Sequence, residues 1–120
     1  MERVQTLFHK GRNVILIDLS SCQPQETLQI LPAAKQEIAK MPAKSALVMT
    51  DVRGAKYDRS LVEAFKEFTA HNTPYVKASA VVGAEGAAHI LLQTLILITR
   101  REMKTFAARG EALEWLTANA

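Results

Sequence analysis

The stretch Asn72-Thr73-Pro74-Tyr75-Val76-Lys77-Ala78-Ser79-Ala80-Val81-Val82-Gly83-Ala84-Glu85-Gly86 decides the fold. A rigid turn at Pro74 leads into an apolar segment, which ends in two glycines in front of a helical pattern. This order is typical of a strand followed by a helix in an open α/β sheet, where the loop after a parallel strand forms the usual ligand-binding edge. The alternation of strand side chains predicts two faces: Val76, Ala78, Ala80 and Val82 on one, and Tyr75, Lys77, Ser79 and Val81 on the other.

Other strands are expected on both sides of this unit. Residues 3–8 form a weak strand, a turn follows at residues 9–12, and the continuous apolar run 13–18 is typical of a central strand covered on both faces. The chain therefore begins with a β-hairpin. Residues 45–50 predict the next buried strand, and residues 103–106 a short last one.

Two helices are predicted before the central stretch. The first starts at Pro24 and breaks near Pro32, because proline removes a backbone hydrogen bond. Its apolar side holds Leu28, Leu31, Ile38 and Met41. The second is capped by Asp58 or by Ser60, the latter forming a capping box with Glu63; it carries Leu61, Phe65 and Phe68 and stops at Asn72.

Two further helices are predicted after the central stretch. Residues 87–99 form a helix whose apolar surface is wider than one core-facing stripe requires, so part of it is expected to meet a second copy of the chain. Residues 110–116 form the last helix, with Leu113 and Leu116 packed on the sheet. The order β-β-α-β-α-β-α-β-α predicts an α/β fold with a mixed sheet, whose first strand is antiparallel to its neighbour.

Length and composition narrow the function classes. A chain of 120 residues with 48% hydrophobic content fits one domain, residues 1–120. The net charge of +3 comes from scattered lysines and arginines, without the basic stripe that nucleic-acid binding needs. A single cysteine, Cys22, and the lack of an apolar leader predict a cytoplasmic protein, and the longest apolar run, residues 84–98, is too polar to cross a bilayer.

Several motifs together resemble one family. They are Thr50-Asp51-Val52-x-Gly54, the block Asn72-x-Pro74-Tyr75-Val76-Lys77-Ala78-x-Ala80-Val81-Val82-Gly83, then Gly86, Thr99-x-Arg101, and Phe106 with Glu111-Ala112-Leu113-x-Trp115-Leu116. Over nearly its whole length the chain resembles the bacterial SpoIIAA-like, or STAS-like, family. The resemblance implies the STAS fold, a mixed five-stranded sheet with four helices, shared with anti-sigma-factor antagonists and the cytoplasmic tails of anion transporters and related in shape to lipid-carrying SEC14 domains. Most members are regulators or binders.

The resemblance also implies the position of a phosphorylation motif. In the antagonists, a strand and loop precede Asp-Ser-Ser or Asp-Ser-Thr, often followed by glycine, and the first hydroxyl is phosphorylated by a partner kinase. Placed by topology, this motif falls on Asp58-Arg59-Ser60-Leu61, so arginine occupies the acceptor position. Ser60 is then either a shifted acceptor or a helix-capping residue, and the second role is the more common for serine in a first helical turn.

Candidate binding residues lie just past the carboxyl ends of strands that should be parallel neighbours, so they could line one crevice. They are Asp18, Ser20, Asp51, Arg53, Gly54, Tyr57, Gly83, Glu85 and Gly86, with Asp58, Arg59 and Ser60 beside them. Arg53 would attract an anion there; alternatively, it pairs with Asp51. Gly83-Ala84-Glu85-Gly86 is better explained by tight strand-to-helix packing than by phosphate binding.

No catalytic set is apparent in the sequence. There is no nucleophile elbow, and His9, His71 and His89 do not have metal-site spacing. We therefore predict a non-catalytic regulatory or protein-interaction domain that needs no cofactor or metal. The alternative is a binder or sensor of a small anionic or lipid-like ligand in the crevice, and an unrecognised hydrolase is a third, weaker hypothesis. A separate prediction is a homodimer whose interface is the helix face from Ile90 to Ile98.

Overall fold

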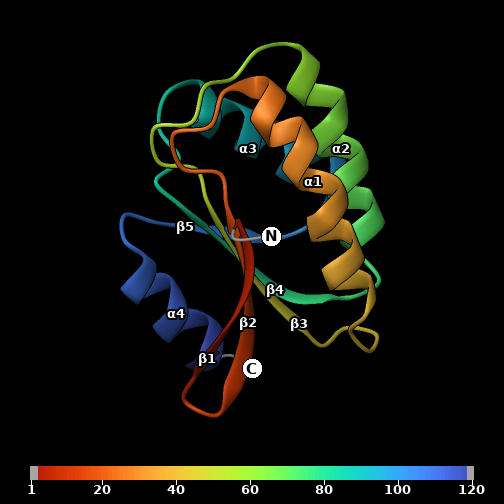
Figure 1. The fold of residues 1–120 in the computed structure, drawn as a ribbon, viewed down its shortest axis with the longest axis vertical. Helices are drawn as coiled ribbons and strands as arrows, with labels where there is room; N and C mark the ends of the chain where they lie inside the picture. Colours follow the sequence, from red (N-terminus) through yellow and green to blue (C-terminus); the bar gives the residue numbers. More distant parts are fainter. Residues whose placement is uncertain (1–2, 119–120) are drawn as a thin grey trace.

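The computed structural model describes residues 3–118 and has the predicted order of elements (Figure 1). The strands are β1 (Val4–His9), β2 (Arg12–Asp18), β3 (Ala46–Asp51), β4 (Val76–Val82) and β5 (Met103–Phe106). The helices are α1 (Pro24–Ala39), α2 (Ser60–Asn72), α3 (Ala87–Thr99) and α4 (Arg109–Ala118). The predicted α/β fold class is confirmed.

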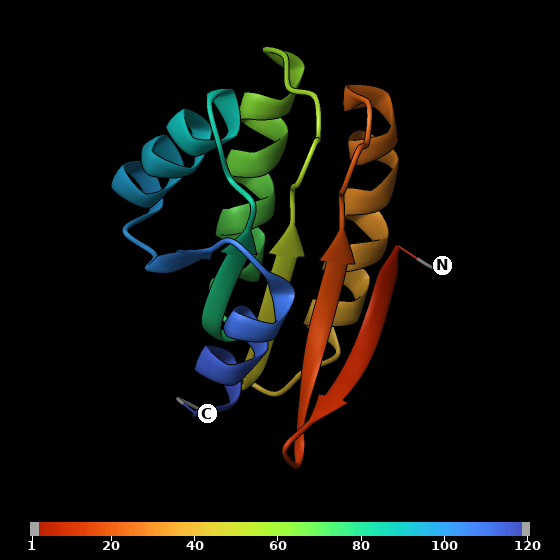
Figure 2. The ribbon, with the colours of Figure 1, turned by 90° about the vertical axis from the view of Figure 1, so that its left-hand side faces the viewer.

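The five strands form one sheet in the order β1-β2-β3-β4-β5. β1 pairs antiparallel with β2, as predicted, and all later pairs are parallel. α1, α2 and α3 cover one face of the sheet, and α4 alone packs on the other (Figures 1 and 2). Because β2 to β5 run the same way, their carboxyl ends and the loops that follow them meet at one edge.

The central strands are buried on both faces, which explains their continuous apolar sequences. In β2, Ile15 and Ile17 belong to the core beneath α1, α2 and α3, whereas Val14 and Leu16 belong to the core beneath α4. From α4, the fully buried Leu116 and the half-buried Leu113 pack into this second core, as predicted.

The predicted break at Pro32 is wrong: α1 runs from Pro24 to Ala39 without interruption. Pro32 lies on the exposed side, where the Leu28 carbonyl that lacks its donor can bind water instead. Leu28, predicted on the apolar side, is also exposed. The buried side of the helix is formed by Thr27, Ile30, Leu31, Ala34 and Ile38.

The predicted alternation of β4 is wrong at Val76. The register with β3 pairs Ala46 with Val76 but Leu47 with Ala78, which leaves Lys77 as one extra residue. A bulge of this kind shifts the alternation by one position. Val76 therefore joins the core beneath α1, α2 and α3, whereas Ala78, Ala80 and Val82 face α4.

α3 has the predicted bounds and turns only part of its apolar surface inward. Leu92 and Leu95 are buried, whereas Ile90, Leu97 and Ile98 are exposed by 68%, 80% and 53%. In the part of the chain that the structure describes, no helix combines the length and apolarity needed to cross a membrane.

Candidate functional site

Asp51 is the centre of a polar cluster at the carboxyl edge of the sheet. Its side chain is fully buried at the end of β3. Three groups of Arg53 donate to it: the backbone N–H at 3.0 Å, Nε at 3.1 Å and Nη2 at 2.8 Å. Arg109, at the start of α4, donates from Nε at 2.7 Å. The predicted Asp51–Arg53 pair is therefore present, but the second arginine was not predicted.

Asp18 forms the second half of this cluster, at the end of β2. Its carboxylate accepts hydrogen bonds from the backbone N–H of Ser20 at 3.0 Å and from the Ser20 hydroxyl. Arg109 Nη2 lies 3.4 Å from it and Arg3 Nη1 3.5 Å. Arg109 thus bridges the ends of β2 and β3, and we call Asp18, Asp51, Arg3, Arg53 and Arg109 the polar rim.

Both carboxylates of the polar rim are ionised at neutral pH. Burial raises the pKa of Asp51, but the hydrogen bonds from Arg53 and Arg109 outweigh burial, so the net pKa lies below its usual value. At Asp18, burial likewise raises the pKa, and the bonds from Ser20 with the charges of Arg109 and Arg3 bring it below the usual value. Neither carboxylate is poised to accept a proton near pH 7.

Gly83 allows Arg53 to take this position. It has a φ of +78°, and a Cβ atom built on it would lie 2.0 Å from Arg53 Cγ. The Arg53 side chain therefore lies directly across the backbone at the end of β4. Gly54 also has a positive φ, +71°, and its missing Cβ would lie 3.2 Å from Ser21 Oγ.

Other predicted site residues lie apart from the polar rim, in a groove between α2 and α3 with a volume of about 430 Å³. This outer groove is lined by Tyr57, Asp58, Arg59, Val62, Ala87, Ile90, Leu91 and Thr94. Asp58 accepts a hydrogen bond from the Ser60 backbone N–H at 2.9 Å and another from its hydroxyl. The N-cap residue of α2 is Arg59, without a side-chain cap bond, so neither predicted cap, Asp58 or Ser60, holds that position. Glu63 pairs with Lys66 and does not form the predicted capping box.

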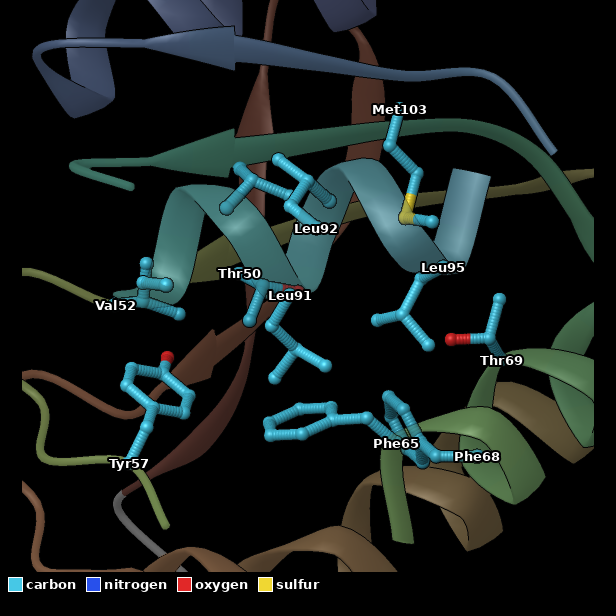
Figure 3. A pocket seen from close by; sticks show the side chains of 12 residues that line it. Thr50, Val52, Tyr57, Phe65, Phe68, Thr69, Leu91, Leu92, Leu95 and Met103 are labelled. Carbon is cyan, nitrogen blue, oxygen red and sulfur yellow. The ribbon is translucent and has the colours of Figure 1, made fainter. Parts of the chain in front are cut away.

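Beneath the outer groove lies an inner chamber of about 70 Å³ between α2, α3 and the sheet (Figure 3). Phe65 and Phe68 of α2 form one wall, and Leu91 and Leu95 of α3 another. Tyr57 and Leu91 line both spaces, so they mark the mouth of the chamber. Burial raises the pKa of Tyr57 to about 12, which keeps this phenol neutral.

The predicted crevice is thus divided. The structure brings Asp18, Asp51, Arg53 and Gly83 together, while Tyr57, Asp58 and Arg59 lie along the outer groove, and Ser60 begins α2. Gly86 is the exposed N-cap residue of α3, with a φ of +54°.

Sequence reasoning missed Arg3 and Arg109, although topology could have found them. Arg109 follows β5, whose carboxyl end lies at the same edge as the ends of β2 and β3. Arg3 precedes β1, which is antiparallel, so its start meets the end of β2.

The Ser20 hydroxyl has no histidine partner among the described residues. Ser20 has a carboxylate as its partner and no imidazole, because His9 pairs with Glu114 and His71 bonds Asn72. His89, on α3, is exposed. Within residues 3–118, no three side chains of His, Cys, Asp or Glu converge as metal ligands would.

Comparisons with known proteins agree with the fold. No protein-family model matches the chain, and no curated protein matches it in sequence. Among solved structures, the chain is similar to an anti-sigma-factor antagonist (STAS) domain protein from Planctomyces limnophilus, with a TM-score of 0.66 and 14% identity. The similarity covers 95% of this chain and 97% of that one. At this level of identity it is the fold that is shared: the chain has the fold of a STAS domain.

Proposed function

We propose that this protein is a non-catalytic regulatory STAS domain that binds another protein through Arg53 and the start of α2. It would act in the cytoplasm of a bacterial cell, as expected for a chain with one unpaired cysteine. The chain shares its fold with an anti-sigma-factor antagonist (STAS) domain protein. This similarity favours another regulatory protein as the partner.

The observation that carries the proposal is the position of Arg53. Its guanidinium is held by a buried carboxylate, yet half of the side chain remains exposed. A charged group that is already fixed loses little conformational entropy on binding, so it can contribute more to affinity than a mobile lysine. The exposed Asp58, Arg59 and Ser60, at the start of α2, supply further polar contacts.

Ser60 contributes to the structure of this edge through its bonds with Asp58. A phosphate on Ser60 would lie next to that carboxylate and be repelled by it. We therefore infer that partner binding does not require phosphorylation at this position, and Ser60→Ala should retain it.

Affinity capture from the native cell extract tests the proposal. Arg53→Ala and Arg59→Ala should recover less of the partner than the wild-type protein. Arg12→Ala is the matched control, because Arg12 is exposed at the opposite end of the sheet. Recovery of no protein but the bait, or equal recovery with all three variants, would rule the proposal out.

The alternative ligand in the strand-end crevice has less support. An anion bound at Arg53 or Arg109 would compete with Asp51, which already accepts from both arginines. A thermal-shift screen of small anions tests this alternative, since a ligand at 100 times its dissociation constant should stabilise the fold by about 2.7 kcal/mol.

We also propose that α3 forms an interface between two copies of the chain. It exposes Ile90, Leu97 and Ile98, and residues 87–99 contain no Lys, Arg, Asp or Glu. Leu97→Glu should shift a dimer toward monomer in sedimentation experiments. Phe8→Glu is the control, since Phe8 is 75% exposed on β1, away from α3. A wild-type protein that is monomeric at high concentration would contradict the proposal.

A further inference from the structure

Arg101 is a half-buried cation close to the inner chamber. It lies between α3 and β5; its Nη1 donates to the Thr69 carbonyl at 3.0 Å and its Nη2 to the Ser79 hydroxyl at 2.5 Å. In the described part of the chain no carboxylate lies within 4 Å of its guanidinium, in contrast to the arginines of the polar rim. Burial lowers the pKa of Arg101. A guanidinium has five N–H donors, and two of them are used by these bonds.

Arg101 borders a small cavity with an unusually polar wall for the interior of a sheet–helix core. The cavity has a volume of about 40 Å³ and is lined by Thr69, Asn72 and Ser79, whose exposures are 4%, 3% and 6%. Each of these side chains can donate a hydrogen bond. We call Arg101 and these three residues the polar end.

The polar end lies next to the inner chamber. Thr50, Phe68, Thr69, Val81 and Met103 line both. Figure 3 shows the Thr69 hydroxyl pointing toward Leu95, that is, toward the chamber. At its opposite end the chamber reaches Tyr57 and Leu91, which also line the outer groove. These three adjoining spaces, which we call the passage, lie between the surface and a half-buried cation with donors around it.

We propose that this passage binds a small apolar monocarboxylate, with its carboxylate at Arg101, Ser79 and Thr69 and its hydrocarbon tail in the inner chamber. Arginine is the side chain best suited to pair with a carboxylate, because its N–H groups match the two oxygens. The apolar lining of Phe65, Leu92 and Leu95 would bury the tail. The site is distinct from the polar rim, and the inference does not rest on the proposed partner binding.

The size of the site limits the ligand. The chamber, about 70 Å³, is smaller than an engineered cavity of about 150 Å³ that binds benzene. An aliphatic tail longer than the chamber would therefore extend past Tyr57 and Leu91 into the outer groove.

Calorimetric titration with three probes tests the proposal. Octanoate carries both head and tail, 1-octanol has the tail without the charge, and acetate has the charge without the tail. Octanoate should bind with a negative heat-capacity change, because apolar surface is buried. 1-Octanol should bind at least about 10-fold more weakly, and acetate should give no heat at the same concentrations.

Two variants test whether the carboxylate of octanoate binds at Arg101 and Thr69. Arg101→Met should weaken octanoate binding about 10- to 100-fold and leave 1-octanol binding unchanged, which also shows that the variant is folded. Arg100→Met is the matched control, since Arg100 is exposed and next in sequence. Thr69→Val, which keeps the shape of the side chain, should weaken octanoate about 3- to 10-fold and serves if Arg101→Met does not fold.

A third variant tests whether the hydrocarbon tail lies in the inner chamber. Ala88 lines the inner chamber, so Ala88→Leu should fill part of it and weaken octanoate and 1-octanol alike. The proposal is overturned if wild-type protein gives no binding heat with millimolar octanoate. It is also overturned if the folded Arg101 and Thr69 variants both bind octanoate as tightly as wild type. The capture experiment with Arg53→Ala has a separate readout, so failure of either hypothesis can be recognised by itself.

Discussion

Replacing Asp51 with asparagine removes the central charge of the polar rim while keeping the shape of the side chain. In the native protein this buried carboxylate accepts three hydrogen bonds from Arg53 and one from Arg109. Loss of one partner of a fully buried ion pair costs about 3–5 kcal/mol. Here the arginine side chains are 50% and 34% exposed, so water can solvate them in part. We therefore expect the free energy of unfolding to fall by about 2–3 kcal/mol.

Urea denaturation at neutral pH measures this loss. With a slope of about 1–3 kcal/mol per molar urea, the midpoint should fall by about 0.7–3 M. Asp18→Asn is the control: its arginine contacts are longer, 3.4 and 3.5 Å, and it should lose no more than about 1 kcal/mol.

The pH dependence provides a second measurement. The pKa of Asp51 is lower in the folded chain than its ordinary value of 3.8, so the carboxylate stabilises the fold above that pH. This contribution is lost as the pH falls through the folded pKa. The difference between wild type and Asp51→Asn should therefore be constant near neutrality and shrink below about pH 4. A loss under about 0.5 kcal/mol at pH 7, or one that stays undiminished at about pH 2, would refute the reasoning.

Three further predictions concern single side chains. Gly83→Ala should destabilise the fold by about 2 kcal/mol or more, because a Cβ there meets Arg53. The control is Gly11→Ala, which has the same φ of +78° and nothing within 4 Å of its Cβ, so it should cost only the backbone strain of about 1–2 kcal/mol. Equal losses of stability for the two variants in urea denaturation would contradict the contact with Arg53. The raised pKa of Tyr57 means that its neutral phenol favours the fold below about pH 10 and that this contribution is lost toward pH 12. Tyr57→Phe should therefore reduce alkaline unfolding, and an unchanged alkaline melting curve would argue against burial of the phenol. The Cys22 thiol is buried, and burial raises its pKa, so a thiol reagent should label it only on unfolding; rapid labelling of native protein would contradict its position.

The fold could be predicted because its central elements have consistent local signals. The apolar run of β2 and the long apolar helix α3 carry patterns that tertiary contacts do not override. Pro32 was misjudged because the cost of proline depends on which side of the helix it occupies, and a sequence without coordinates does not fix that side. Val76 was misjudged because a bulge depends on the register with a neighbouring strand.

The site was harder to predict because its charges come from distant segments. The rule that parallel strand ends share an edge identified Asp18, Asp51 and Arg53, but was not extended to the residue after β5 or before β1. It also placed Tyr57 in the same crevice, with Arg59 beside it, whereas the loop after β3 carries both to the outer groove. Arg101 was named only as part of the motif Thr99-x-Arg101, since only three-dimensional packing shows that it borders a cavity and has no carboxylate of the described residues nearby.

The position of α4 has a consequence for how the chain folds during synthesis. This helix is tied to the start of the molecule at two points, through Arg109 to Asp18 and through Glu114 to His9, which is 105 residues away in sequence. A ribosome adds about 5–20 residues per second, so roughly 5 to 20 s pass between synthesis of the N-terminal hairpin and synthesis of α4. During that interval Val14 and Leu16 have no helix to bury them. Nascent chains stalled before α4 should therefore be the ones that chaperones and proteases engage most strongly.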